Sequence, residues 1–215
     1  MFELVIFDCD GVLVDSERIT NTVLAGMLNE LGLSVSLNDM FEHFMGKSMP
    51  QCLELITTML GKSPPSNFEE RYRERSRVAL ETGLLPVPGV AEMLNELKLP
   101  CCVASGGSHD KMRTTLGITG LLHRFQGRLY SVTEVTCGKP APDVFLYAAA
   151  QCGVKPGACA VVEDTPTGVQ AGVAAGMTVF GYSGLIGAKQ LRSAGAHYVF
   201  KHMRELNSLL NQKAP

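Results

Sequence analysis

The sequence predicts an α/β protein: a Rossmann-like, doubly wound parallel sheet that carries an inserted, all-helical cap domain. From residue 87 to the C-terminus, short apolar segments of strand length alternate with helical patterns, which is typical of a parallel sheet with right-handed crossovers. Before this alternation, four helical patterns follow one another directly after the first apolar segment, Leu4–Phe7. We therefore assign residues 1–15 and 87–215 to a core that contains the sheet and residues 16–86 to a helical cap.

The cap begins with a helix over residues 16–31. Ser16 is a suitable N-cap, apolar residues then recur at helical spacing, and Gly32 ends the helix. The segment 83–89 is rich in glycine and proline, so we expect the chain to return to the core there through a hinge. Between these points, turns that contain glycine or proline separate helices predicted over residues 37–44, 50–60 and 68–81.

The core elements follow in regular order. Short, continuous apolar runs are expected for strands that are buried on both faces of a sheet, and helices are predicted from apolar residues at helical spacing. The predicted order is helix 90–97, strand 101–104, helix 110–116, strand 129–131, helix 143–152, strand 159–162, helix 168–175, strand 178–180, helix 188–194 and strand 198–200.

Composition and charge limit the partners that we expect. With 19 basic and 21 acidic residues the formal net charge is −2, so neither nucleic acid nor an anionic membrane is an expected partner. No apolar run approaches the roughly 18 residues of a membrane span, and the N-terminus lacks the pattern of a signal peptide. The seven cysteines show no metal-site or redox spacing, which favours reduced thiols. We expect a cytoplasmic monomer that acts on a small molecule.

Polar clusters occur near the carboxyl ends of the predicted strands, where open α/β sheets bind ligands. Asp8 and Asp10 follow the first strand. Two carboxylates about 4 Å apart repel each other by roughly 4 kcal/mol at an effective dielectric constant near 20, so a cation is needed if both are ionised, and Mg²⁺ is the natural candidate. The clusters are, in chain order, Asp8-Cys9-Asp10-Gly11, Ser105-Gly106-Gly107, Gly138-Lys139-Pro140 and Glu163-Asp164.

Each cluster by itself has a simpler explanation. The first could be only a turn, the second a loop, Lys139 a surface charge, and Glu163 with Asp164 a helix-capping pair. It is nevertheless unusual for unrelated features to place carboxylates, a hydroxyl, glycine amides and an ammonium group together at one edge of a sheet. Together they favour a site for phosphoryl chemistry, in which positioning and charge neutralisation supply most of the catalysis.

These segments resemble the four motifs of phosphatases of the haloacid dehalogenase superfamily. The helical insert after the first motif resembles the cap of the subgroup that holds phosphoglycolate phosphatase and β-phosphoglucomutase. The resemblance implies Mg²⁺-dependent hydrolysis of a small phosphomonoester through an aspartyl-phosphate, with a sugar phosphate, a phosphorylated sugar acid such as 6-phosphogluconate, or a phosphoglycolate-like compound as substrate. The matching segments cover residues 7–17, 104–106, 138–143 and 163–172.

The resemblance also implies a role for each site residue. Asp8 would be the nucleophile, and Asp10 the acid and then the base. Ser105 and Lys139 would bind the oxygens of the transferring phosphoryl group. The magnesium ion would be held by Asp8, by the backbone carbonyl of Asp10 and by Asp164, with Glu163 either a ligand or beside the metal.

Further substrate contacts are expected from the core and from the cap. In the core these would come from Gly11, Gly106 and Gly107, where the backbone can approach a phosphate closely. In the cap we expect Lys47, in a turn, and Arg77. Glutamates alternate with the arginines of the helix that contains Arg77, so most of these arginines should form a solvated, ion-paired face, and Arg77 is the expected exception.

Two other classes of function remain open. A β-phosphoglucomutase-like enzyme would interconvert sugar phosphates, but β-phosphoglucomutases carry a histidine at the position that Thr20 occupies here. A non-catalytic regulatory protein on the same fold would be expected to have lost a motif residue, and all are present. Dehalogenation is not expected, because dehalogenases lack the counterpart of Asp10. A Schiff-base mechanism would need a supported cap lysine, and neither Lys47 nor Lys62 shows such support.

Overall fold

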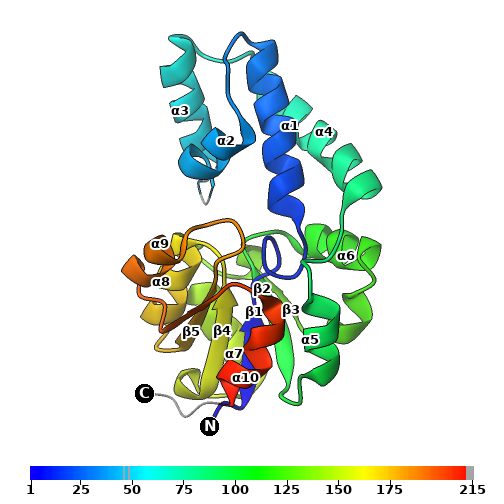
Figure 1. Cartoon of the computed structure of the whole chain (residues 1–215), viewed down its shortest axis with the longest axis vertical. Coiled ribbons are helices and arrows are strands. Elements are labelled where there is room, and N and C mark those ends of the chain that lie inside the picture. Colours follow the sequence, from blue (N-terminus) through cyan, green and yellow to red (C-terminus); the bar gives the residue numbers. More distant parts are fainter. Residues whose placement is uncertain (46, 48, 212–215) are drawn as a thin grey trace. The chain divides into compact units, whose positions relative to one another are not determined.

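The computed structural model of the protein describes residues 1–45, 47 and 49–211 (Figure 1). Internal contacts divide the chain into two compact units, residues 1–15 with 85–215 and residues 16–84. The first unit is built on one parallel sheet of six strands in the order β3-β2-β1-β4-β5-β6. This is the doubly wound α/β fold that the sequence predicts.

The strands of the sheet are short and buried, as the apolar runs predict. Residues of β1, β2 and β4 are all buried, so both faces of the sheet are covered. The strands are β1 Leu4–Phe7, β2 Cys101–Ser105, β3 Leu129–Ser131, β4 Cys159–Glu163, β5 Thr178–Tyr182 and β6 Tyr198–Phe200.

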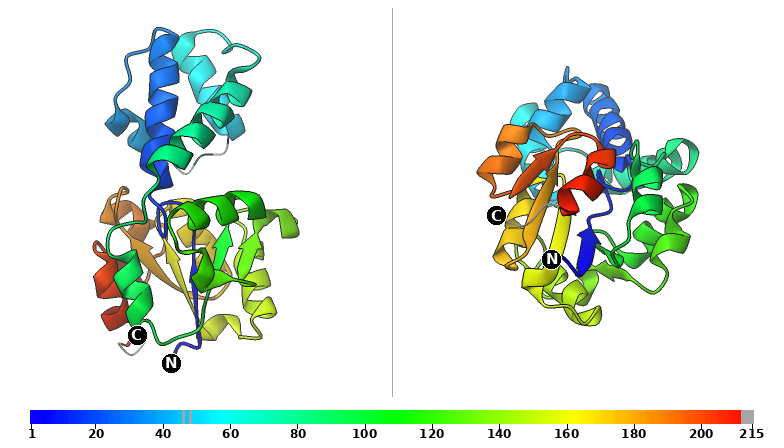
Figure 2. Two further views of the ribbon diagram at one scale, coloured as in Figure 1. Left: turned by 90° about the vertical axis from the view of Figure 1, so that its right-hand side faces the viewer. Right: turned by 60° about the horizontal axis from the view of Figure 1, so that its bottom comes forward.

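Helices flank this sheet on both faces (Figure 2). The side chains of Phe7, Phe125, Phe145 and Phe180 are almost completely buried and are among the largest in its core. The helices are α5 Val90–Glu96, α6 His109–Ile118, α7 Asp143–Gln151, α8 Pro166–Ala174, α9 Ala188–Ser193 and α10 Leu206–Leu210.

The strand register brings several carboxyl ends to one edge of the sheet. Phe7, the last residue of β1, pairs with Val103 of β2 on one side and with Val162 of β4 on the other. The amide of Asp8 continues the ladder by donating to the carbonyl of Val162 at 3.0 Å. The residues that follow β1, β2 and β4 therefore emerge side by side.

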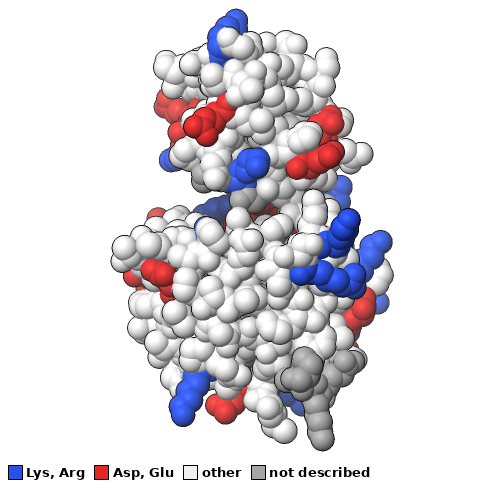
Figure 3. All heavy atoms as spheres, turned by 90° about the vertical axis from the view of Figure 1, so that its left-hand side faces the viewer, with Lys and Arg blue, Asp and Glu red and all other residues white. Residues whose placement is uncertain are grey.

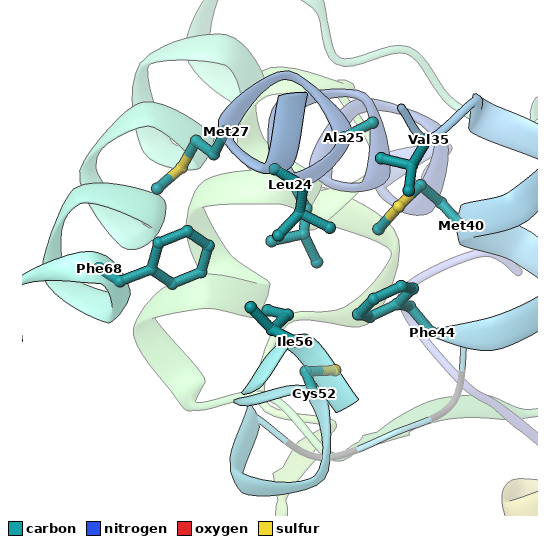
Figure 4. Packing of buried hydrophobic residues seen from close by; sticks show 10 residues of the cluster. Leu24, Ala25, Met27, Val35, Met40, Phe44, Cys52, Ile56 and Phe68 are labelled. Carbon is teal, nitrogen blue, oxygen red and sulfur yellow. The ribbon is translucent and has the colours of Figure 1, made fainter. Parts of the chain in front are cut away.

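The described residues of the second unit form four helices with a hydrophobic core of their own. Apolar residues at helical spacing on α1, among them Leu24, Met27 and Leu28, pack against residues such as Ile56 and Phe68 from the other helices (Figure 4). The helices are α1 Ser16–Glu30, α2 Leu37–His43, α3 Met49–Leu60 and α4 Phe68–Gly83.

The return of the chain to the first unit occurs at Leu85, two residues before the predicted boundary. The amide of Asp15 donates to the carbonyl of Leu85, and the amide of Val87 donates to the carbonyl of Leu13, both at 3.0 Å. These hydrogen bonds pair the outgoing and returning segments, so residues 85 and 86 belong with the sheet rather than with the four helices.

Charged side chains are scattered among uncharged ones on the face shown in Figure 3, in keeping with the small net charge. Within the described part of the chain, no helix combines the length and the apolar character needed to cross a bilayer.

Candidate active site

Lys139 forms hydrogen bonds to residues at the carboxyl ends of three neighbouring strands. Its Nζ donates to Asp8 Oδ1 after β1 at 2.5 Å, to the carbonyl of Ala104 in β2 at 3.2 Å, and to Glu163 Oε1 at the end of β4 at 2.6 Å. The side chain of Lys139 is only 11% exposed. These contacts place an ammonium group at the centre of the predicted site.

The segment around Lys139 is held by its own hydrogen bonds. The amide of Ala141 donates to the carbonyl of Gly138 at 3.0 Å, and the amide of Cys137 donates to the carboxylate of Asp143 at 3.2 Å. Phe145 follows in the first turn of α7, and its ring centroid lies 4.7 Å from Lys139 Nζ. At this distance the face of the aromatic ring attracts the buried cation.

Asp8 lies in an environment that penalises its charge. Burial raises the pKa of Asp8 to about 7, against the lowering effect of Lys139 and with a further rise from Glu163 and Asp10. Burial alone would lower the pKa of Lys139, but the negative charges of Asp8 and Glu163 outweigh it and raise that pKa above its ordinary value. Lys139 is therefore charged, and one cation faces several buried carboxylates.

Both carboxylate oxygens of Glu163 accept hydrogen bonds from other groups of the protein. One carboxylate oxygen accepts from Lys139, and the other accepts from the amides of Asp164 and Thr165 and from the Thr165 hydroxyl at 3.0–3.1 Å. A Cβ atom at Gly168 would lie 1.9 Å from the Glu163 carboxylate, so only glycine fits there. This bonding favours Glu163 as the residue that holds Lys139 rather than as a metal ligand.

Asp164 is almost completely buried and lies against the loop that follows Asp10. A Cβ atom at Gly11 would come within 2.1 Å of Asp164 Oδ2, and Gly11 has φ of 76°, which disfavours any side chain. Glycine is thus required at position 11 for two reasons: its backbone has a positive φ, and the Asp164 carboxylate leaves no room for a Cβ atom. The structure brings together the motifs that contain Asp8 and Asp164, which lie far apart in the sequence.

The loop after β2 is built from the predicted Ser105, Gly106 and Gly107. The amide of Gly107 donates to Ser105 Oγ at 3.0 Å, and Gly106 is exposed with open space where a Cβ would lie. Ser131, at the end of β3, donates from its hydroxyl to the carbonyl of Gly107 at 2.7 Å. Sequence reasoning missed Ser131, although its position at a strand end was a usable signal.

Lys111 is the second site residue that sequence reasoning missed. It lies in the first turn of α6, and its Nζ donates to Asp10 Oδ2 at 2.7 Å. A lysine in the first turn of a helix has no feature that marks it as functional, so the sequence offers no signal for it.

The predicted cap residues belong to the four-helix unit. Arg77 donates to Glu74 at 2.7 and 3.0 Å and to Glu81 at 2.6 Å, so it is part of the ion-paired helix face rather than the exception that the sequence suggested. Lys47 is exposed, and its neighbours Gly46 and Ser48 lie outside the described residues. Substrate contacts by Lys47 and Arg77 stay predictions.

The carboxylates at this edge suit a hard cation. Asp8 and Asp164 offer oxygen ligands, and the buried negative charge exceeds what Lys139 neutralises. Across the described residues, no group of three or more His, Cys, Asp or Glu side chains forms a ready metal cluster. Mg²⁺ does not need one, because it is commonly held by one or two carboxylates and completes its shell with water and substrate phosphate. The donor set therefore fits Mg²⁺ with a backbone carbonyl and waters as further ligands.

Comparison with known proteins decides the family. The sequence pattern of haloacid dehalogenase-like hydrolases matches residues 2–176. The chain belongs to this family. Membership confirms the resemblance drawn from the four motifs, and the protein is an enzyme of the hydrolase class.

Curated relatives in this family carry the names of phosphatases and a mutase. The chain is 31% identical over 179 residues to 6-phosphogluconate phosphatase of Escherichia coli, covering 83% of this chain and 81% of the relative. It is 33% identical to hexitol phosphatase A of the same organism, covering 81% and 80%. Identity to β-phosphoglucomutase of Bacillus subtilis is 30%, covering 82% and 81%.

Solved structures share the complete haloacid dehalogenase fold. A haloacid dehalogenase-like protein of Agrobacterium tumefaciens superposes with a TM-score of 0.93 at 34% identity, covering 98% of both chains. A family hydrolase of Deinococcus radiodurans, with bound phosphate and sodium, has a TM-score of 0.85 at 33% identity and covers 97% of this chain and 95% of its own.

Proposed function

We propose that this haloacid dehalogenase-like enzyme is a Mg²⁺-dependent phosphatase that hydrolyses a small phosphorylated sugar or sugar acid through an aspartyl-phosphate on Asp8. The observation that carries the proposal is the position of Lys139 Nζ, which bonds both Asp8 and Glu163 at the sheet edge. The names of relatives that act on 6-phosphogluconate and hexitol phosphates support a sugar phosphate as substrate.

The geometry supports a reaction in two steps. First, a carboxylate oxygen of Asp8 bonds to phosphorus while the bond to the substrate oxygen breaks, and Asp10 donates a proton to that oxygen. Asp10 then takes a proton from water, the water oxygen bonds to phosphorus, and inorganic phosphate leaves as Asp8 is restored. Two modest barriers replace one large barrier.

Charge neutralisation at the phosphoryl group comes from the protein and from the metal. Lys139 lies beside Asp8, where the phosphoryl oxygens gather negative charge in the transition state. A bound Mg²⁺, held by Asp8, by the carbonyl of Asp10 and by Asp164, would supply further positive charge there. Ser105 and the amides of its loop would complete the cradle.

Phosphate release from a panel of phosphorylated sugars, sugar acids and glycolate tests this proposal directly. We expect release that requires Mg²⁺ and is abolished in Asp8→Asn. Asp110→Asn is a matched control, because Asp110 is 96% exposed at the start of α6. Appreciable turnover by Asp8→Asn would refute the nucleophile assignment, and a panel without turnover would refute the proposed reaction.

The same assay separates the alternatives. A mutase would interconvert sugar phosphates without net phosphate release. At the position where β-phosphoglucomutases carry histidine, the hydroxyl of Thr20 donates to the carbonyls of Ser16 and Glu17 in its own helix, which gives it no acid–base role. A regulatory protein would show neither reaction, although Asp8, Lys139 and their partners are in place.

A further inference from the structure

Helix α6 contacts the loop that carries the two aspartates of the first motif. The side chain of Cys9, between Asp8 and Asp10, is buried, and its Sγ lies 3.9 Å from Thr115 Oγ1 on α6. The Thr115 hydroxyl also donates to the carbonyl of Lys111, one turn earlier on the helix, at 2.9 Å. The loop and the first turns of α6 are therefore packed against each other.

This packing places the side chain of Lys111 next to Asp10. Its backbone is fixed at the helix start, where its amide donates to the N-cap hydroxyl of Ser108 at 3.3 Å. Its Nζ donates to Asp10 Oδ2 at 2.7 Å, and the two side chains are 42% and 15% exposed. The ammonium group of Lys111 thus forms an ion pair with one oxygen of the Asp10 carboxylate, which is largely shielded from water.

The stem of Lys111 passes close to Gly107. A Cβ atom at Gly107 would lie 3.2 Å from Lys111 Cδ and 3.8 Å from Asp10 Oδ2, so glycine leaves room for the lysine to pass. Ser131 fixes the carbonyl of Gly107 from the other side. Contacts therefore run without a break from Ser131 of β3 through Gly107 and Lys111 to Asp10.

We propose that Lys111 is a positioning residue that holds Asp10 in the orientation in which it donates a proton to the leaving oxygen. This rests on the proposed phosphatase function and deepens it. In this arrangement Lys139 contacts the nucleophile Asp8, and Lys111 contacts the acid Asp10.

This role makes a prediction that depends on the leaving group. Sugar alkoxides leave poorly and need a proton, whereas p-nitrophenolate leaves without one. Loss of Lys111 should therefore slow phosphoryl transfer from a sugar phosphate far more than from p-nitrophenyl phosphate. A residue that only binds the phosphate, or only stabilises the fold, would affect both esters alike.

The test compares kcat/KM of Lys111→Met, Lys111→Arg and wild type on both esters, the sugar phosphate being the one that wild type hydrolyses best. General acid catalysis contributes about 10² to 10⁴ in rate, so we expect Lys111→Met to lose about 10- to 100-fold in kcat/KM on the sugar phosphate and much less on the aryl ester. Lys111→Arg should recover most of the loss. Arg113→Met, which removes an exposed charge from the same helix, is the control.

Two results would overturn the assignment: equal losses of kcat/KM on both esters, or no loss of kcat/KM on the sugar phosphate. Thermal unfolding of each variant shows whether the fold is intact. Wild-type turnover of the two esters tests the phosphatase function separately, so failure of that function is distinguishable from failure of the role given to Lys111.

Discussion

Replacing Lys139 with methionine tests the buried charge arrangement most severely. Methionine has a similar volume, but it removes the donor to Asp8, Glu163 and the Ala104 carbonyl. Breaking a buried ion pair costs about 3–5 kcal/mol because the remaining charge is buried without a partner. Lys139→Met leaves two carboxylates without this partner, but we expect the loss in free energy of unfolding to stay in this range. The reason is that Asp8, with a pKa of about 7, can take up a proton and become neutral.

The expected destabilisation is measurable by thermal unfolding. For a chain of this size, 1 kcal/mol shifts Tm by about 2–4 °C, so Lys139→Met should lower Tm by about 6–20 °C in metal-free buffer. Lys189→Met is the matched control, because Lys189 is exposed on α9, and it should unfold near the wild-type temperature. A Tm for Lys139→Met within about 2 °C of the control would refute the buried pairing. Phosphatase activity should be lost in Lys139→Met and kept in the control.

Three further predictions concern the same edge of the sheet. Gly168→Ala places a Cβ 1.9 Å from the Glu163 carboxylate, so it should displace Glu163 and reduce both kcat and Tm, whereas Gly157→Ala, which meets open space, should change kcat little. The raised pKa of Asp8 means that the native state binds more protons than the unfolded state between about pH 4 and 7. The free energy of unfolding of the metal-free protein should therefore fall as pH rises through this window, and urea titrations at pH 5 and 8 that showed no fall would contradict it. Mg²⁺ should raise Tm of wild type and not of Asp164→Asn, and an equal rise in both would remove Asp164 from the metal site.

Much of the fold could be predicted because its physical causes are local. β1 and β4 are continuous apolar runs buried on both faces, and the helices between strands show helical spacing with clear breakers. Strand ends were set too early: β2 and β4 continue through Ser105 and Glu163, because a polar side chain at the sheet edge does not prevent backbone pairing. Helix α10, Leu206–Leu210, was missed because five residues are too few for a periodic pattern.

The candidate site was predictable where residues follow strands, and Lys139, eight residues beyond the end of β3, was predictable from its motif. Asp8 and Ser105 come directly after apolar runs, so topology alone places them at one edge. Lys111 depends on the packing of α6 against the loop of Cys9, which no local pattern encodes. The indirect role of Glu163 depends on which donors surround each oxygen. The pairs of Arg77 with Glu74 and Glu81, in contrast, have the helical spacing that already predicts an ion-paired face.

Chemical trapping tests directly whether Asp8 carries the phosphoryl group during turnover. Wild-type enzyme would be mixed with a sugar phosphate and Mg²⁺, quenched in acid during turnover, and treated with borohydride, which reduces an acyl phosphate to the alcohol. We predict that mass spectrometry finds homoserine at Asp8 and at no other carboxylate. Homoserine at a different residue, or unmodified Asp8 in enzyme that is turning over, would contradict the account.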